Sequence, residues 1–401
     1  MEPVNAIELL GVTKRFGEVV ANDNVNLTVR KGEILSILGE NGSGKTTLMN
    51  MLSGIYFPDE GEIRVNGKTV TIRSPKDSFE LGIGMIHQHF KLINILTAAE
   101  NIILGLPGKE RLNLKQVEKE VKELTDRYGF DLNPSQKIYD MSVSQKQTVE
   151  IVKVLYRGAD ILILDEPTAV LTPQETEKLF AVLRNMRAAG KSIIIITHKL
   201  HEVLSISDRV AILRKGEYVG DIATKDADEA KLTEMMVGEK VELNIERPEP
   251  LNPVKRLDIE HLTVRSAEGI TVLDDASFPV YGGEILGIAG ISGNGQKELL
   301  EAIAGLQPTE SGSISYITDS GEKEELIGKD PLAIADMGVS LSFVPEDRLG
   351  MGLAPSLSIT DNMLLKNYNE DNPWNPVVNR NRGRAEAESI ISELGIVTPS
   401  T

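Results

Sequence analysis

The sequence predicts an α/β protein in which mainly parallel sheets are flanked by helices. Short apolar strands alternate with amphipathic helices, a glycine-rich loop joins one of these strands to a helix, and one spacing of glycines occurs twice along the chain. Strands that alternate with helices pair in parallel, because each helix returns the chain to the side of the sheet where the next strand starts. The repeat indicates two copies of this fold.

The strands of the first copy are short apolar runs. They cover residues 34–38, 161–164 and 192–197, and the second run lies between Asp160 and Asp165. Runs that are apolar on both faces are typical of strands in the middle of a parallel sheet.

The helices are marked by their caps and their apolar stripes. A helix is predicted from residue 45, directly after the glycine-rich loop, to residue 52. A later helix is capped by Thr172, which forms a capping box with Glu175, and Pro173 takes the first helical position. Residues 98–155 are helical in pattern, and we expect them to form a subdomain inserted into the first α/β domain. The apolar stripes consist of Val117, Val121, Leu124 and Tyr128, and of Leu179, Val182, Leu183 and Met186.

The two copies are related by glycines at one constant interval. The pairs are Gly39 and Gly290, Gly54 and Gly305, and Gly61 and Gly312. We expect a first domain in residues 1–240, a linker in 241–255 and a second, incomplete domain in 256–401. The linker contains three prolines, which deny it a helix and make it a semi-stiff spacer.

Composition excludes several classes of protein. The net charge of -17 opposes direct binding to nucleic acid or anionic lipid, so contact with a membrane should go through a protein partner. The lack of cysteine excludes a disulfide framework and a cysteine-ligated zinc site, and it fits a reducing cytosol. The first residues lack the apolar core of a signal peptide, and no apolar run reaches the ~18 residues that a membrane-spanning helix needs.

Residues 39–46, Gly-Glu-Asn-Gly-Ser-Gly-Lys-Thr, form a P-loop between a predicted strand and a predicted helix. Glycines let backbone N–H groups turn inward around a β-phosphate, and the helix adds its positive end. Lys45 can reach the β- and γ-phosphates, and the Thr46 hydroxyl can ligate Mg²⁺. A structural glycine turn is the alternative, but such a turn would not need to lie between a strand and a helix. The residues expected to hold ATP here are Gly39, Asn41, Gly42, Ser43, Gly44, Lys45, Thr46 and Thr47.

Two acids and a histidine follow the later strands. Asp165 and Glu166 end the strand 161–164, at the edge of the sheet where parallel strands receive phosphates. We expect Asp165 to hold the magnesium shell and Glu166 to act as the general base on the attacking water. His198 follows the strand 192–197 and could contact the γ-phosphate. A surface acid pair and a solvent-facing loop histidine are the alternatives.

The order of these motifs resembles the ATPase domain of ABC transporters. The resemblance covers residues 7–238 closely and residues 257–401 as a partial second copy. It implies a P-loop NTPase fold that adds an antiparallel β subdomain and an inserted helical subdomain to the parallel sheet.

The resemblance also implies roles for residues outside the P-loop. Phe16 would stack on adenine, although a lone phenylalanine is otherwise more often a core residue. Gln88 would touch Mg²⁺ and take part in catalysis. A signature loop, which caps the nucleotide of the opposite domain, would contain Ser142, Ser144 and Gln145.

The tandem arrangement and residues 344–348 (Val-Pro-Glu-Asp-Arg) resemble the double ATPase subunits of bacterial sugar and nucleoside importers. Residues 86–90 (Ile-His-Gln-His-Phe) resemble the nucleoside branch more than the pentose or galactose branch. The resemblance implies two integral membrane permease subunits, an external solute-binding protein and a place at the cytoplasmic face of the cell membrane. A soluble tandem ATPase of other function would need a long charged arm or a zinc module. A non-hydrolysing module is opposed by Lys45 and Glu166.

The second copy departs from the first at its P-loop. Gln296 stands where Lys45 stands and Lys297 where Thr46 stands, so the ammonium and the magnesium hydroxyl are lost. Glu346 takes the position of Gln88. Double subunits of this type continue to a second signature loop and acid strand, so we expect this chain to be shorter than its relatives and its two nucleotide sites to be unequal.

Overall fold

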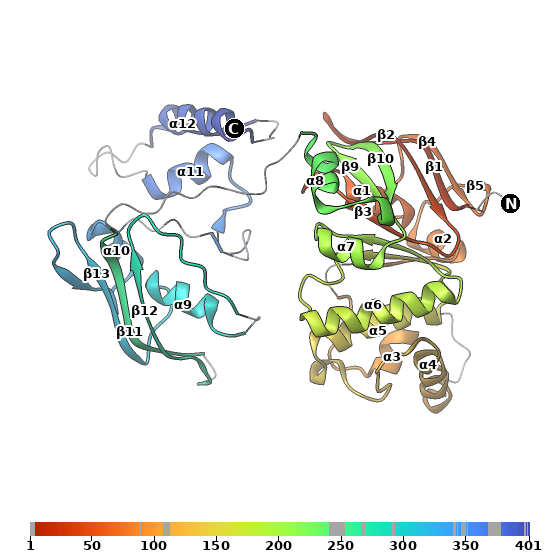
Figure 1. Cartoon of the computed structure of the whole chain (residues 1–401), viewed down its shortest axis with the longest axis horizontal. Coiled ribbons are helices and arrows are strands. Elements are labelled where there is room, and N and C mark those ends of the chain that lie inside the picture. The colour runs from red at the N-terminus through yellow and green to blue at the C-terminus, as the bar shows by residue number, and fades with distance from the viewer. Residues whose placement is uncertain are drawn as a thin grey trace. The chain divides into compact units, whose positions relative to one another are not determined.

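The computed structural model describes residues 5–87, 90–106, 113–239, 253–266, 269–290, 293–339, 342, 344–345, 350, 352–367, 378–396, 398 and 400–401. The chain forms two compact units, Met1–Ile245 and Glu246–Thr401, and Figure 1 shows their elements. Each unit is described by itself. In these ranges no helix combines the length and the apolar character needed to span a bilayer.

The first unit is built on a six-stranded sheet. Its strands are β3 (Ile34–Leu38), β6 (Ile83–Ile86), β7 (Ile161–Asp165), β8 (Ser192–Ile196), β9 (Arg209–Arg214) and β10 (Glu217–Ala223). They lie in the order β10-β9-β3-β8-β7-β6, all parallel except β10 at the edge. Every residue of β3 and β8 is buried, which is why these runs are apolar throughout. The predicted mainly parallel sheet is confirmed.

Helices cover this sheet and form the inserted subdomain. They are α1 (Lys45–Leu52), α2 (Pro75–Glu80), α3 (Ala98–Ile103), α4 (Leu114–Tyr128), α5 (Val143–Tyr156), α6 (Pro173–Ala188), α7 (Leu200–Ile206) and α8 (Glu229–Val237). In the subdomain, α3 and α4 pack with α5, and Val117, Val121 and Tyr128 of α4 are buried there. The capping box at Thr172 starts α6 as the sequence predicts.

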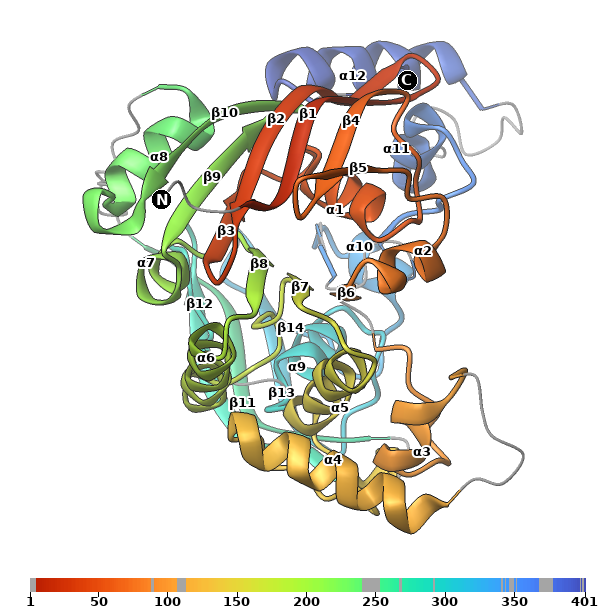
Figure 2. The ribbon, with the colours of Figure 1, turned by 90° about the vertical axis from the view of Figure 1, so that its right-hand side faces the viewer.

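An antiparallel sheet lies, with α1, over the face of the six-stranded sheet that is opposite to α5 and α6. It consists of β1 (Asn5–Phe16), β2 (Val19–Arg30), β4 (Glu60–Val65) and β5 (Lys68–Val70), in the order β2-β1-β4-β5. Ile161 and Ile163 of β7 belong to the core shared with this sheet and α1. The intervening Leu162 and Leu164 belong to the core under α5 and α6. Figure 2 shows the layers in sequence, from β1 and β2 through β8 and β7 to α5 and α6.

The second unit repeats the antiparallel sheet. Its strands are β11 (Lys255–Arg265), β12 (Thr271–Tyr281), β13 (Ser311–Ile317) and β14 (Lys323–Glu325), and their order β12-β11-β13-β14 matches that of the first unit. Two of the three repeated glycine pairs share left-handed backbones: φ is +75° at Gly54 and +73° at Gly305, and it is +93° at Gly61 and +103° at Gly312. A Cβ on Gly54 or Gly305 would lie within 2.6 Å of a backbone carbonyl oxygen, so only glycine fits. The helices are α9 (Gln296–Ile303), α10 (Pro331–Asp336), α11 (Ile359–Asn367) and α12 (Arg380–Glu393).

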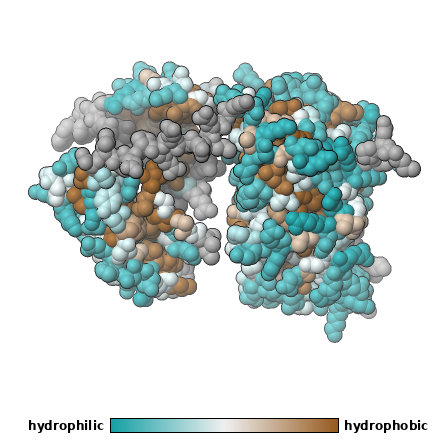
Figure 3. Space-filling model, in the orientation of Figure 1, coloured by the Kyte–Doolittle hydropathy of each residue, from teal (hydrophilic) through white to brown (hydrophobic). Residues whose placement is uncertain are grey.

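One part of the repeat differs from the first copy. Residues 284–290 correspond to β3, yet they form no strand, and Ile285 is 88% exposed. In the described part of the second unit no strand is paired with this segment, so its backbone groups lack the ladder that β8 and β9 provide for β3. In the view of Figure 3, apolar residues gather on the second unit around β12 and α9.

A buried ion pair ties the start of β3 to β9. The Arg209 guanidinium lies 3.4 Å from Glu33 Oε2 and 2.8 Å from Asp221 Oδ2, and the side chains of Arg209 and Glu33 are 5% and 8% exposed. Burial raises the pKa of the Glu33 carboxyl although Arg209 opposes this. The pair therefore fixes the strand that leads into the P-loop.

We expect Arg209→Leu to lower the unfolding free energy of the first unit by about 3–5 kcal/mol, because it leaves the buried Glu33 carboxylate without its cation. Urea denaturation measures this loss. The control is Arg187→Leu, which removes an arginine whose side chain is 46% exposed and paired with Asp208, and which should cost less than about 1 kcal/mol. Equal losses in the two variants would contradict the role given to Arg209.

Candidate functional site

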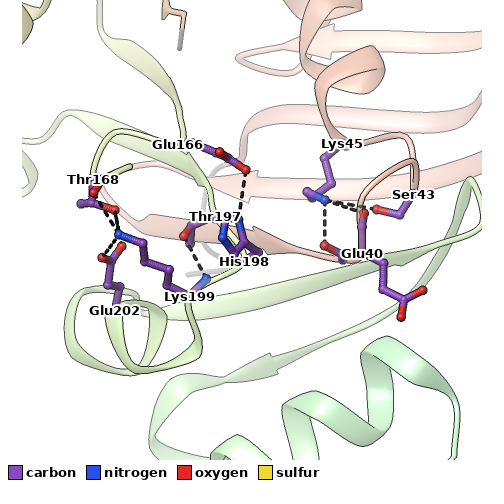
Figure 4. A network of polar contacts seen from close by, with 10 residues as sticks. Glu40, Ser43, Lys45, Glu166, Thr168, Thr197, His198, Lys199 and Glu202 are labelled. Carbon is purple, nitrogen blue, oxygen red and sulfur yellow. Dashed lines mark hydrogen bonds and ion pairs between the residues drawn. The ribbon is translucent and has the colours of Figure 1, made fainter. Parts of the chain in front are cut away.

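The P-loop wraps around the ammonium of Lys45. Lys45 Nζ donates to the carbonyl oxygens of Gly39 and Glu40 at 2.7 and 2.8 Å, and it lies 3.4 Å from Ser43 Oγ (Figure 4). The residue is only 7% exposed, and this burial lowers the pKa of the ammonium against the pull of nearby carboxylates. The loop thus holds a partly desolvated cation between β3 and α1.

The loop is pressed against β2 at its last glycine. Gly44 has φ +92°, and a Cβ there would lie 2.3 Å from the carbonyl oxygen of Ala21. Asn22 Nδ2 donates to the Gly44 carbonyl at 3.3 Å. The left-handed turn at Gly44 directs the chain into α1, whose first N–H groups therefore face the loop. Of the other predicted residues, Ser43 is buried, Thr47 is half-buried, and Asn41, Gly42 and Thr46 are exposed.

Asp165 and Glu166 lie at the end of β7, close to Lys45. Burial raises the pKa of the Asp165 carboxyl, and the neighbouring Glu166 raises it further. Lys45 and a hydrogen bond from the Thr46 hydroxyl act in the opposite direction. The two half-buried carboxylates and the buried lysine therefore form one mutually dependent group of charges.

Glu166 is joined to His198 from the neighbouring strand. Its Oε1 lies 3.0 Å from His198 Nδ1, and Figure 4 shows the two side chains facing each other. Glu166 also has a left-handed backbone, with φ +47°. The parallel order β3-β8-β7 brings the three loops to one edge of the sheet, so Lys45, His198 and the acids meet there.

Phe16 ends β1 and presents an aromatic surface. Its ring is 43% exposed and packs edge-on against Tyr56, with 5.1 Å between the ring centroids. The ammonium of Lys14 lies 5.4 Å from the centre of the same ring. The exposed part of this ring can stack on a flat aromatic group.

The residues of the predicted signature loop start α5. Ser142 caps this helix and forms a capping box with Gln145. Ser144 hydrogen-bonds Glu175 of α6, and Gln147, which is buried, donates to the Pro167 carbonyl at 2.6 Å. These contacts attach the start of α5 to the loop after β7 rather than to the P-loop.

A comparison with known families decides what this arrangement is. The family model described as ABC transporter matches residues 22–169 and, a second time, residues 273–400. The chain belongs to the ABC transporter family. The ABC fold and ATP hydrolysis that the sequence predicts are therefore confirmed, and the import ATP-binding proteins described next show that this subunit is of the import type.

Curated ABC relatives match nearly the whole chain. The guanosine import ATP-binding protein NupO of Bacillus subtilis is 44% identical over 397 residues, which are 98% of this chain and 76% of that protein. The nucleoside import ATP-binding protein NupA of Lactococcus lactis is 45% identical over 90% of this chain and 71% of its own length. The glucose import ATP-binding protein TsgD13 of Haloferax volcanii is 42% identical over 97% of this chain and 75% of its own.

A solved ABC structure matches the fold. The ADP conformation of an ATP-binding cassette of an ABC transporter, MJ1267, superposes with a TM-score of 0.52 at 26% identity. The match covers 59% of this chain and 99% of that cassette. The ADP conformation of this cassette agrees with nucleotide binding by the fold.

Two predicted ABC residues cannot be placed. Gln88 and Glu346 lie outside the described residues. At the second P-loop, the side chain of Gln296 occupies the space over Gly290, because a Cβ on Gly290 would lie 2.2 Å from Gln296 Nε2. The glutamine amide thus packs against its loop, as the Lys45 ammonium does in the first unit, but it carries no charge.

Sequence reasoning missed a cluster beside the acids. Thr168, Lys199 and Glu202 are joined by hydrogen bonds, and Thr168 and Glu202 are only 2% and 5% exposed. A lysine three residues before a glutamate at the start of a helix is the one signal in the sequence, and this spacing is usually a solvent-exposed pair.

Residues of the first unit fit Mg²⁺ as well as nucleotide. The Thr46 hydroxyl lies near enough to the Asp165 carboxyl to lower its pKa, and both groups are the hard oxygen ligands that Mg²⁺ prefers. Among the described residues no cluster of three or more histidines and acids could hold a metal by itself. A site with two protein oxygens suits an ion that keeps waters and shares phosphate oxygens.

We expect Lys45→Ala to weaken ATP binding on the order of ten- to a hundredfold, because it removes a charge-assisted contact to the phosphates. Isothermal calorimetry measures the dissociation constant. Lys31→Ala, which removes an exposed lysine before β3, is the control and should bind as the parent does. An unchanged constant for Lys45→Ala would contradict the site.

We expect Asp165→Asn to raise the melting temperature of the nucleotide-free chain by a few degrees at neutral pH. The pKa of Asp165 is raised in the folded state, so its charged form destabilises the fold above that pKa. The gain should shrink as the pH falls through the raised pKa, and it should vanish where the carboxyl is protonated in both states. Calorimetric melts at acid and neutral pH test this, with the exposed Asp160→Asn as control. A lower melting temperature at neutral pH would contradict the prediction.

Proposed function

We propose that the first unit hydrolyses MgATP with Glu166 as the general base, and that this drives uptake of a nucleoside through partner permeases. The observation that carries the proposal is the 3.0 Å contact between Glu166 and His198 at the sheet edge that also holds Lys45. A carboxylate held by a histidine can accept a proton from water placed in line with the γ-phosphate.

Each side chain has one task in this site. Lys45 moves from its loop carbonyls to the β- and γ-phosphates, while the N–H groups of the loop from Gly39 to Thr47 surround the β-phosphate. Thr46 and Asp165, with Gln88, would hold Mg²⁺, which would supply positive charge that neutralises the phosphates. His198 orients Glu166, and Phe16 stacks on adenine.

The signature loop acts on a different nucleotide. Ser142, Ser144 and Gln145 would cap the ATP of an opposing domain, as the family resemblance implies. Ser144 stands where the resemblance leads one to expect glycine, and it lies near Glu175, whose pKa it helps to lower. Gln296 gives the second P-loop no ammonium. We therefore propose that the nucleotide sites are unequal, with one that hydrolyses ATP and one that holds nucleotide slowly.

A groove beside the subdomain suits the permeases. It has a volume of about 230 Å³ and lies between α2, β6 and α5. Four of its lining residues are basic, His87, Lys91, Lys153 and Arg157, and one is acidic, Glu150. Burial lowers the pKa of Lys153 and of Arg157, so a carboxylate from a partner would find desolvated cations there. We propose that the chain works with two permeases. A cytoplasmic helix of one of them enters this groove and places an acidic residue against the cations.

The solute is proposed from the relatives. NupO and NupA are named for guanosine and nucleoside import, and residues 86–90 resemble the same branch. In this proposal an external binding protein delivers the nucleoside to the permeases, and the chain lies at the cytoplasmic face of the cell membrane.

We expect Glu166→Gln to bind ATP normally and to lose at least ~10²-fold in turnover, because the amide keeps the shape but cannot take the proton. ATP hydrolysis and guanosine uptake by vesicles that contain the complete transporter measure both effects. Glu177→Gln, on the exposed face of α6, is the control and should retain both. Near-normal hydrolysis in Glu166→Gln would assign the base elsewhere, and hydrolysis that guanosine does not stimulate would contradict the solute.

A further inference from the structure

The backbone that carries Glu166 is strained. Its φ of +47° lies in the left-handed region, which a residue with a side chain enters only at a cost. Glu166 N donates to the Ile196 carbonyl at 2.9 Å, and the Glu166 carbonyl accepts from Ala169 N at 3.2 Å. A conformation of this kind persists where the surrounding contacts over-determine it.

The chain two residues later is held from the next strand. Lys199 Nζ donates to the Thr168 carbonyl at 2.9 Å and lies 3.0 Å from Glu202 Oε1. The Thr168 hydroxyl donates to Glu202 Oε2 at 2.5 Å. We call these three residues the Thr168 clamp, and Figure 4 shows them gathered around the Lys199 ammonium.

The clamp depends on the charge of Lys199. Thr168 is 2% exposed and Glu202 is 5% exposed. A buried carboxylate is tolerated when a cation and hydrogen-bond donors satisfy it. Without Lys199, the Glu202 carboxylate would keep one hydroxyl donor and attract water, and both contacts of the ammonium with Thr168 would be lost.

Two contacts close a ring around the proposed base. Thr168 lies two residues after Glu166, and Lys199 directly follows His198. The bond between Lys199 and Thr168 closes one side of the ring, and the 3.0 Å contact between Glu166 and His198 closes the other. One segment carries Glu166 and Thr168, and the other carries His198 and Lys199. The distance between the two segments at the clamp therefore controls the distance between Glu166 and His198.

We infer that Lys199 and Glu202 are positioning residues for ATP hydrolysis, which act by holding Thr168 and so keep Glu166 aligned with His198. The inference rests on the proposed role of Glu166, and it assigns to the buried pair a task beyond stability.

The test is Lys199→Met in the full chain, since methionine keeps much of the length and loses the charge. Amide hydrogen exchange, read by mass spectrometry on the peptide that spans residues 165–172, should become faster. The dissociation constant for ATP should stay within about twofold, because the P-loop is untouched. In the complete transporter kcat should fall roughly tenfold at constant KM, as expected for a misplaced catalytic group.

The matched control is Lys191→Met. Lys191 Nζ donates to the Ala159 carbonyl at 2.8 Å and to Asp160 Oδ1 at 2.6 Å, so it also bridges a carbonyl and a carboxylate between β7 and β8. It does so at the opposite ends of these strands. Lys191→Met should leave both the exchange of residues 165–172 and kcat unchanged.

A second variant separates stability from positioning. Lys199→Met combined with Glu202→Gln removes the uncompensated charge, so it should regain melting temperature but not turnover. Unchanged exchange of residues 165–172 in Lys199→Met, equal effects of Lys191→Met, or recovery of turnover in the double variant would each overturn the inference. Failure of the parent chain to bind ATP would instead overturn the proposed function. The hydrogen exchange of residues 165–172 would still test the clamp, because that measurement does not require bound ATP.

Discussion

An ammonium and two carboxylates share one buried sheet edge, and much of the first unit serves to keep them there. Lys45, Asp165 and Glu166 come from loops after β3 and β7, which β8 separates. Charges at such low exposure require partners at hydrogen-bond distance, so the strands that deliver them must keep their register. The apolar strands, the cores on both faces and the Arg209 pair at the other end of β3 all meet this requirement.

Much of the fold follows from short-range signals in the sequence. The helix from Lys45 and the capping box at Thr172 have the starts that their local residues dictate. Pairing in parallel then places the ends of β7 and β8 beside the P-loop, so the meeting of the acids with Lys45 could also be predicted. The Thr168 clamp could not, because its residues come from two loops and their burial depends on packing that no local pattern records.

The second unit shows where a repeat in sequence stops being a repeat in structure. Gly305 and Gly312 keep the left-handed turns of Gly54 and Gly61, since neighbouring backbone leaves no room for a side chain at either position. The segment equivalent to β3 carries similar residues, Glu284, Ile285 and Leu286, but strand formation needs neighbours as well as sequence. Local turns are therefore transferable between copies, whereas a buried strand is a property of the whole sheet.

The aromatic pair at the end of β1 has a consequence for the choice of nucleotide. Phe16 offers a ring without donors or acceptors, held edge-on by Tyr56. Stacking responds to the face of a base and not to its edge, because every base has a π-face. In the proposed site, the affinity for a nucleotide is therefore set by the triphosphate. A preference for adenine over guanine would then have to come from contacts other than the Phe16 ring.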